Sequence, residues 1–118
     1  MGYYEDLNLI KLFMELRSEY WNNSIPIINI YFHDQNFMGE YIFPRNSKED
    51  FYDNYSIGIK KDLKTKQKID TILHEMTHHY VFTNNKELVW SNKIYMHGKL
   101  WRQEMRRIGF TGKITKYS

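Results

Sequence analysis

The 118-residue sequence contains no cysteine, and this absence excludes two classes of structure. Disulfide bridges cannot form, and no metal site can be built from thiolate ligands. A metal ion would have to be held by histidine and carboxylate side chains instead. The redox compartment stays open, because a chain without cysteine folds in either environment.

Long apolar runs are also absent from the sequence. No segment approaches the roughly 20 apolar residues that a membrane-spanning helix needs. The N-terminal segment MGYYEDLNLIKLF contains acidic residues and lacks the basic stretch, followed by an apolar stretch, that marks a secretory signal. We therefore expect a cytoplasmic protein without a membrane partner.

Charge of one sign is only slightly in excess, with a net charge of +3 and a pI near 9.0. This balance permits an acidic partner such as nucleic acid but does not demand one. Hydrophobic residues make up 42% of the chain and aromatic residues 17%, which excludes the disordered class and supplies a core. No repeat or linker divides the chain, so we expect one domain over residues 1–118.

The apolar pattern predicts one helix followed by three short strands. Apolar residues recur at helical spacing over residues 6–20. Residues 25–32, IPIINIYF, are rich in isoleucine and aromatic residues and have a proline near their start, which is typical of a strand. Residues 37–43 and 55–60 are predicted to be two further strands, and residues 33–36, HDQN, a hairpin connection between the first two.

Over residues 65–82 the apolar period becomes 3.6, which predicts a helix. At about 100° per residue, one face of this helix carries Ile69, Ile72, Leu73, Met76 and Tyr80. His74 and His78 fall on the opposite side, together with Val81 and Phe82. A helix that is apolar nearly all round is normally buried between two layers, so both histidines are expected in the interior.

The segment HEMTHHY, residues 74–80, combines residue types that bind metals and move protons. His74 and His78 are four residues apart, so on a helix their imidazoles stand one above the other and can reach one ion. Glu75 lies one step round the helix, where its carboxylate can take a proton from a water on the metal. This H-E-x-x-H arrangement predicts a metal site with a glutamate as general base.

A catalytic zinc site needs a third protein ligand, and the sequence offers several. The candidates are His33, His79, His97, Glu87 and Glu104. His79 points about 100° away from His78, which makes it a poor third ligand. His97 has the best case, because it heads the inward face of a predicted last helix, formed by Leu100, Trp101, Glu104, Met105 and Ile108. Glu104 shares this face and is either a supporting group, an alternative ligand or a structural residue.

The motif H-E-x-x-H followed by HGKLW, residues 97–101, resembles the SprT-like zinc metallopeptidases. In that family the third histidine begins an H-G-x-x-aromatic motif. The order MGEY, YSIGIKKDL, TILHEMTHHY and HGKLW also resembles the core of the family, and the likeness covers roughly residues 5–110. The sequence resembles a minimal form, since a chain without cysteine carries no cysteine-rich zinc ribbon.

The resemblance implies both a fold and a site. The fold is a zincin-like α+β domain with an N-terminal helix, a small twisted three-stranded sheet, a buried metal-binding helix and a C-terminal helix carrying the third ligand. The site would consist of one Zn²⁺ held by His74, His78 and His97, with Glu75 as the catalytic residue. By donor type alone, three imidazoles also suit copper, iron or nickel.

Two classes of function follow from these residues. The first is a zinc-dependent endopeptidase acting on protein or peptide substrates. The second is a small basic module that binds DNA or protein and uses the metal only to hold its fold together. Glu75 favours the enzyme, because a purely structural site has no use for a proton acceptor beside its ligands.

Two surface features bear on the partner. The basic run KKDLKTKQK, residues 60–68, and the outward stripe of Lys99, Arg102 and Arg106 are compatible with nucleic-acid contact, although such clusters are more often solvated faces. Residues 55–59 are the extended segment nearest in sequence to the metal helix. We expect them to form an edge strand that can pair with a substrate peptide.

Overall fold

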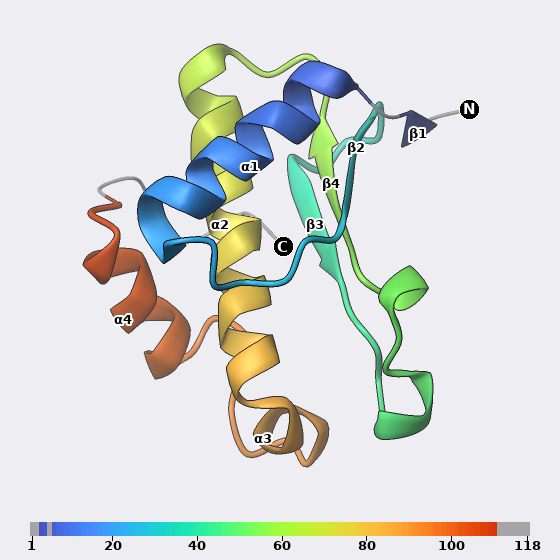
Figure 1. Cartoon of the computed structure of the whole chain (residues 1–118), viewed down its shortest axis with the longest axis vertical. Helices are drawn as coiled ribbons and strands as arrows, with labels where there is room; N and C mark the ends of the chain where they lie inside the picture. Colours follow the sequence, from blue (N-terminus) through green and yellow to red (C-terminus); the bar gives the residue numbers. More distant parts are fainter. Residues whose placement is uncertain (1–2, 5, 111–118) are drawn as a thin grey trace.

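The computed structural model describes residues 3–4 and 6–110 (Figure 1). Helix α1 (Leu7–Trp21) comes first, and its start is set by Asp6, whose carboxylate accepts the backbone N–H groups of Asn8 and Leu9. The helix ends at Asn22, which adopts a left-handed conformation with φ of 51°. The predicted helix over residues 6–20 is therefore confirmed to within one residue at each end.

The sheet contains the three predicted strands, which are β2 (Asn29–His33), β3 (Gly39–Ile42) and β4 (Ser56–Lys60). A two-residue strand, β1 (Tyr3–Tyr4), extends one edge, so that the spatial order is β1-β2-β4-β3. Strand β2 pairs in parallel with β4, and β3 pairs antiparallel with β4. The predicted α+β class with its small sheet is confirmed.

Residues 33–36 do not form the predicted hairpin, because β2 and β3 pair with β4 and not with each other. The first strand is also shorter than predicted, since residues 25–28 form a loop ahead of β2. Pro26 has no N–H to offer a ladder, and Ile25 and Ile28 reach the core from this loop without strand pairing.

The expectation that residues 55–59 form an edge strand is wrong. Strand β4 is covered by β2 on one side and by β3 on the other. The reason lies in its burial, since Ile57, Gly58 and Ile59 are all inaccessible to solvent and the ring of Tyr31 lies directly against Gly58. A strand buried on both faces takes the centre of a sheet.

Three further helices follow the sheet, namely α2 (Thr65–Asn84), α3 (Lys86–Trp90) and α4 (Lys99–Arg107). Helices α1, α2 and α4 lie on one side of the sheet, with α2 between α4 and the strands (Figure 1). The predicted helix over residues 65–82 is confirmed and continues for two more residues. In the described part of the chain, no helix is both long and apolar enough to cross a membrane.

The core forms where α2 meets the other helices and the sheet. Every residue from 71 to 79 is buried, as expected for a helix enclosed on all sides. Ile72 and Met76 of α2 join a cluster of buried apolar side chains that includes Leu9, Phe13, Ile57, Ile59, Phe82, Trp101 and Met105. The metal-binding motif is thus carried by the most enclosed element of the fold.

Candidate metal centre

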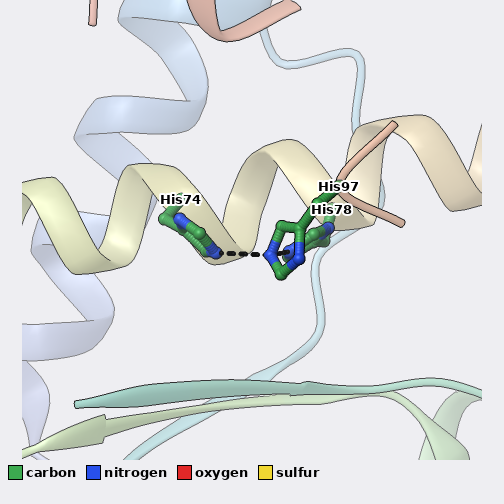
Figure 2. Close-up of side chains that lie close together, drawn as sticks. All are labelled: His74, His78 and His97. Carbon is green, nitrogen blue, oxygen red and sulfur yellow. Dashed lines mark hydrogen bonds between the residues drawn. The ribbon is translucent and has the colours of Figure 1, made fainter. Parts of the chain in front are cut away.

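Helix α2 places His74 and His78 on one face, one turn apart. Their ring centroids are 4.9 Å apart, and both side chains are buried. Four residues of α-helix rise about 6 Å, so the two rings lie alongside each other without any distortion of the backbone. Figure 2 shows both imidazoles projecting from the same side of α2 towards His97.

His97 approaches this pair from the loop between α3 and α4. Its Nε2 atom lies 3.2 Å from Nε2 of His74 and 3.0 Å from Nε2 of His78 (Figure 2). Within the described residues, these three side chains are the one set of three or more potential ligands that converge on a point. The predicted trio of histidines is therefore brought together, and it could hold a metal ion.

The spacing of the three nitrogens fits a shared ion better than a set of hydrogen bonds. Two nitrogens that ligate one tetrahedral ion at about 2.0–2.1 Å lie about 3.3 Å apart, close to the distances from His97 to its neighbours. A neutral imidazole nitrogen carries either one hydrogen or one lone pair. Nε2 of His97 therefore cannot satisfy both neighbours by hydrogen bonding, whereas one cation can be bound by all three lone pairs.

Burial favours the form of His97 that binds metal. Partial burial, helped by the nearby charge of Arg102, lowers the pKa of His97 below its usual value of 6.5. Only a neutral imidazole has a lone pair free for a metal ion. The environment thus favours the neutral form of His97, which could bind a metal ion, at neutral pH.

His97 lies in a turn and not in the last helix, which corrects the prediction. The helix begins at Lys99, and the N–H of Gly98 donates to the carbonyl of Tyr95 at 2.9 Å. A Cβ atom at position 98 would lie 2.9 Å from that same oxygen, so the turn needs glycine. This close approach explains why glycine follows the third histidine.

Trp101 forms a wall behind all three histidines. Its indole is fully buried, and it stacks on His78 with centroids 5.2 Å apart and rings inclined by 20°. Its centroid is 4.7 Å from that of His74 and 4.9 Å from that of His97, and its Nε1–H donates to the His74 carbonyl at 3.3 Å. The aromatic residue of the HGKLW motif therefore orients the imidazoles.

Glu75 is fully buried beneath strand β3. A Cβ atom built on Gly39 would lie 2.8 Å from Oε2 of Glu75 and 2.5 Å from Cγ2 of Thr71, so β3 passes directly over the carboxylate. The absence of a side chain at position 39 makes this approach possible. This role of Gly39 was not predicted from the sequence, because the contact joins residues far apart in the chain.

One buried histidine beside the site serves the structure. His79 lies between the Tyr41 hydroxyl, at 2.7 Å from Nδ1, and the Pro26 carbonyl, at 2.9 Å from Nε2. Burial lowers the pKa of His79 to about 4, so Nε2–H donates to Pro26 and Nδ1 accepts from Tyr41. Because Tyr41 belongs to β3, this chain of bonds connects the edge strand to α2, and His79 is not a ligand of the site.

The other candidate ligands lie elsewhere. His33 is buried at the end of β2, with its ring 4.4 Å from that of Phe37, and Glu87 is exposed on α3. Glu104 accepts the indole N–H of Trp21 at 2.8 Å and pairs with Arg107 at 2.6 Å. Its buried carboxylate therefore joins the ends of α1 and α4, and of the alternatives left open for Glu104 the structural one is correct.

Together, the fold and the site define an α+β domain in which two histidines of one helix and a third from a turn could hold a metal ion beside a buried glutamate. The chain matches the SprT-like family over residues 9–117, which is nearly its whole length. It belongs to this family. No curated protein and no solved structure matches the chain significantly.

Proposed function

We propose that this protein is a zinc-dependent endopeptidase that cleaves protein or peptide substrates. In this proposal His74, His78 and His97 hold one Zn²⁺, and Glu75 is the catalytic residue. Three neutral imidazoles with an open fourth position are a common ligand set for catalytic zinc. Membership of the SprT-like family and the converging histidines support this assignment.

The observation that carries the proposal is the position of Glu75. The residue follows the ligand His74 directly and lies buried against the backbone of Gly39 in the outermost strand. A metal that only held the fold together would need no carboxylate there, and burying one is costly. A general base needs a fixed position close to the substrate, which this packing supplies.

Each residue has a separate part in the proposed reaction. Zinc held by the three histidines would supply Lewis-acid activation of the scissile carbonyl and of the attacking water. Glu75 would accept a proton from the attacking water and deliver it to the leaving amine. Trp101 and the buried face of α2 keep the imidazoles in place and exclude bulk solvent from one side of the site.

The substrate is proposed to pair with β3 instead of β4. Among the described strands, β3 pairs with β4 alone, and the peptide is proposed to pair with its other side at Tyr41, next to α2. The N–H of Lys60 donates to the carbonyl of Met38, and in an antiparallel ladder the pairing alternates along the strand. The backbone groups of Tyr41 consequently face away from β4, towards the proposed substrate.

The test compares wild-type protein with Glu75→Gln. The variant keeps the shape of the side chain and both neighbouring histidines but removes the proton acceptor. We expect zinc content and circular dichroism to be unchanged while cleavage of an unfolded protein falls by about 10²-fold or more. Self-cleavage is a second readout, and each assay is run with and without double-stranded DNA because the surface is basic.

Two results would count against the proposal in different ways. Zinc-loaded wild-type protein that cleaves nothing under these conditions would favour the binding module with a structural metal. Equal activity in Glu75→Gln would keep an enzyme but remove Glu75 from its role. Elemental analysis of protein purified without added metal decides between zinc and another ion.

A further inference from the structure

A cavity of about 290 Å³ lies just beyond the C-terminal end of β3. One wall contains Phe43 and Arg45, which follow β3 directly, and the other contains Ile94, Tyr95 and Met96, which lead directly to the ligand His97. The two segments that flank the metal site thus continue into this cavity. Its volume is at the lower end of the roughly 300–1,000 Å³ of small-molecule sites, which suits a single large side chain.

The cavity lining mixes polar groups, among them Asn92, with aromatic rings, and the aromatic part is held firmly. Trp90 lines the cavity, and its indole N–H donates to the Pro44 carbonyl at 2.8 Å, which fixes the ring and uses its only donor. The rings of Phe43 and Trp90 both pack on buried Phe82, with centroids 4.8 Å and 5.7 Å away. These two rings form a preformed apolar patch within the cavity, which can bind an apolar side chain at a reduced ordering cost.

The only charged side chain among the described residues that line the cavity is that of Arg45, which is positive. The guanidinium of Arg45 lies 4.6 Å from the centre of the Phe43 ring, and the side chain is exposed. None of the described residues that line the cavity is acidic. A lysine or arginine side chain entering it would meet repulsion from Arg45 and find no carboxylate partner.

We propose that this cavity is a substrate subsite that receives one large apolar side chain, such as Phe, Leu or Met, and disfavours Lys and Arg. The proposal rests on the proposed function, because the occupant is a peptide paired with β3. The subsite lies at the far end of that strand from Glu75, so it selects a residue some distance from the cleaved bond.

The direction of the peptide decides which side of the bond is selected. Strand β3 runs in the same direction as α2. Gly39 lies over Glu75, and Tyr41, further along β3, contacts His79, which is further along α2. Antiparallel pairing is the more stable ladder. A peptide antiparallel to β3 places its N-terminal part towards Phe43, so the subsite holds a residue N-terminal to the cleaved bond.

The first experiment maps cleavage sites by mass spectrometry after zinc-loaded protein digests a mixture of denatured proteins. We expect enrichment of Phe, Leu and Met, and depletion of Lys and Arg, at one position N-terminal to the cleaved bond. Arg45→Glu should raise the frequency of Lys and Arg at that position by about threefold to tenfold. Arg106→Glu makes the same charge change on the exposed side of α4 and should leave the profile unchanged.

The second experiment measures binding without cleavage, by NMR of the Trp90 indole N–H in zinc-loaded Glu75→Gln. The probes are two pools of random decapeptides that differ only in carrying one Phe or one Lys. We expect the Phe pool to shift the signal and the Lys pool to have little effect, and Trp90→Phe assigns the resonance.

The two readouts separate the subsite from the peptidase. Cleavage without a preference at any N-terminal position, together with an unmoved Trp90 signal, would overturn the subsite and leave the peptidase intact. A Trp90 shift specific to the Phe pool in a protein that cleaves nothing would support the subsite and overturn the peptidase. An unchanged profile in Arg45→Glu would overturn the role of Arg45 in rejecting basic residues.

Discussion

Adding one methyl group at Gly39 should disable the site without removing its metal. In Gly39→Ala the new Cβ would lie 2.5 Å from Cγ2 of Thr71, 2.8 Å from Oε2 of Glu75 and 3.3 Å from its Cγ. Carbon atoms normally approach no closer than about 3.5 Å, so either the strand lifts or the Glu75 carboxylate moves. Overpacking of this size costs about 1–3 kcal/mol of unfolding free energy.

The loss of activity should exceed the loss of stability. Displacing the proposed general base, or the strand that holds the substrate above it, is expected to lower kcat/KM by about 10²-fold or more. The three histidines lie on α2 and in the loop before α4, so zinc content should stay at the wild-type value. Proteolysis of an unfolded substrate, urea denaturation and elemental analysis measure the three quantities.

Gly58→Ala is the matched control. Gly58 lies opposite Glu40 in the neighbouring strand, and a Cβ atom there would lie 2.8 Å from the ring of Tyr31. The steric conflict is therefore similar, but it involves Tyr31 and not Glu75. We expect comparable destabilisation with activity largely kept. Full activity in Gly39→Ala, or an equal loss in both variants, would refute the reasoning.

Three further predictions concern the metal, acid stability and the buried carboxylate. Wild-type protein should bind one zinc per chain at neutral pH and release it well below pH 6.5, as the ligands take up protons, and His97→Ala should lose it; a folded variant that retains zinc in elemental analysis would contradict the three-histidine site. Because burial lowers the pKa of His79 to about 4, the unfolded chain binds a proton there that the folded protein does not, so the unfolding free energy should decline as the pH falls from about 6.5 towards 4. His79 accounts for up to about 3 kcal/mol of this loss of unfolding free energy. Denaturant titrations should show a shallower decline of the unfolding free energy with falling pH in His79→Gln. Equal slopes in the two proteins would argue against a neutral buried imidazole. Glu104→Ala should cost about 1–3 kcal/mol by leaving the buried indole N–H of Trp21 without its partner, yet zinc content should not change; zinc loss from a folded variant would make Glu104 part of the site.

The sequence by itself determined the features that depend on local geometry. His74 and His78 are four residues apart in a segment with a 3.6-residue apolar period, so their side chains meet wherever the helix is placed. The apolar residues around the whole helix predicted its burial, and residues 71–79 are buried. The three strands and their approximate positions followed from the same kind of short-range pattern.

It was also predictable that His97 lies close to His74 and His78, but not that it lies in a turn ahead of the last helix. The inward face of the last helix and the HGKLW motif indicated where the third imidazole comes from. Helical periodicity placed His97 inside that helix, whereas the bond from Gly98 to Tyr95 holds it in a turn just before. The difference arises because a helix boundary depends on individual backbone bonds that an apolar pattern does not resolve.

Only the tertiary structure decided the order of the strands and, with it, which strand is proposed to pair with a peptide. Strand β4 lies at the centre of the sheet because both of its faces are buried. One of the residues that bury it is Tyr31, which packs on Gly58 from 27 positions earlier in the chain. The contacts of Gly39 with Glu75 and of Tyr41 with His79 likewise depend on the packing of segments that are far apart in the sequence. Two residues of strand, from Gly39 to Tyr41, span about 6.7 Å, and four residues of helix, from Glu75 to His79, span about 6 Å. The two spacings are similar, so both contacts form at once, but only when β3 is packed against α2.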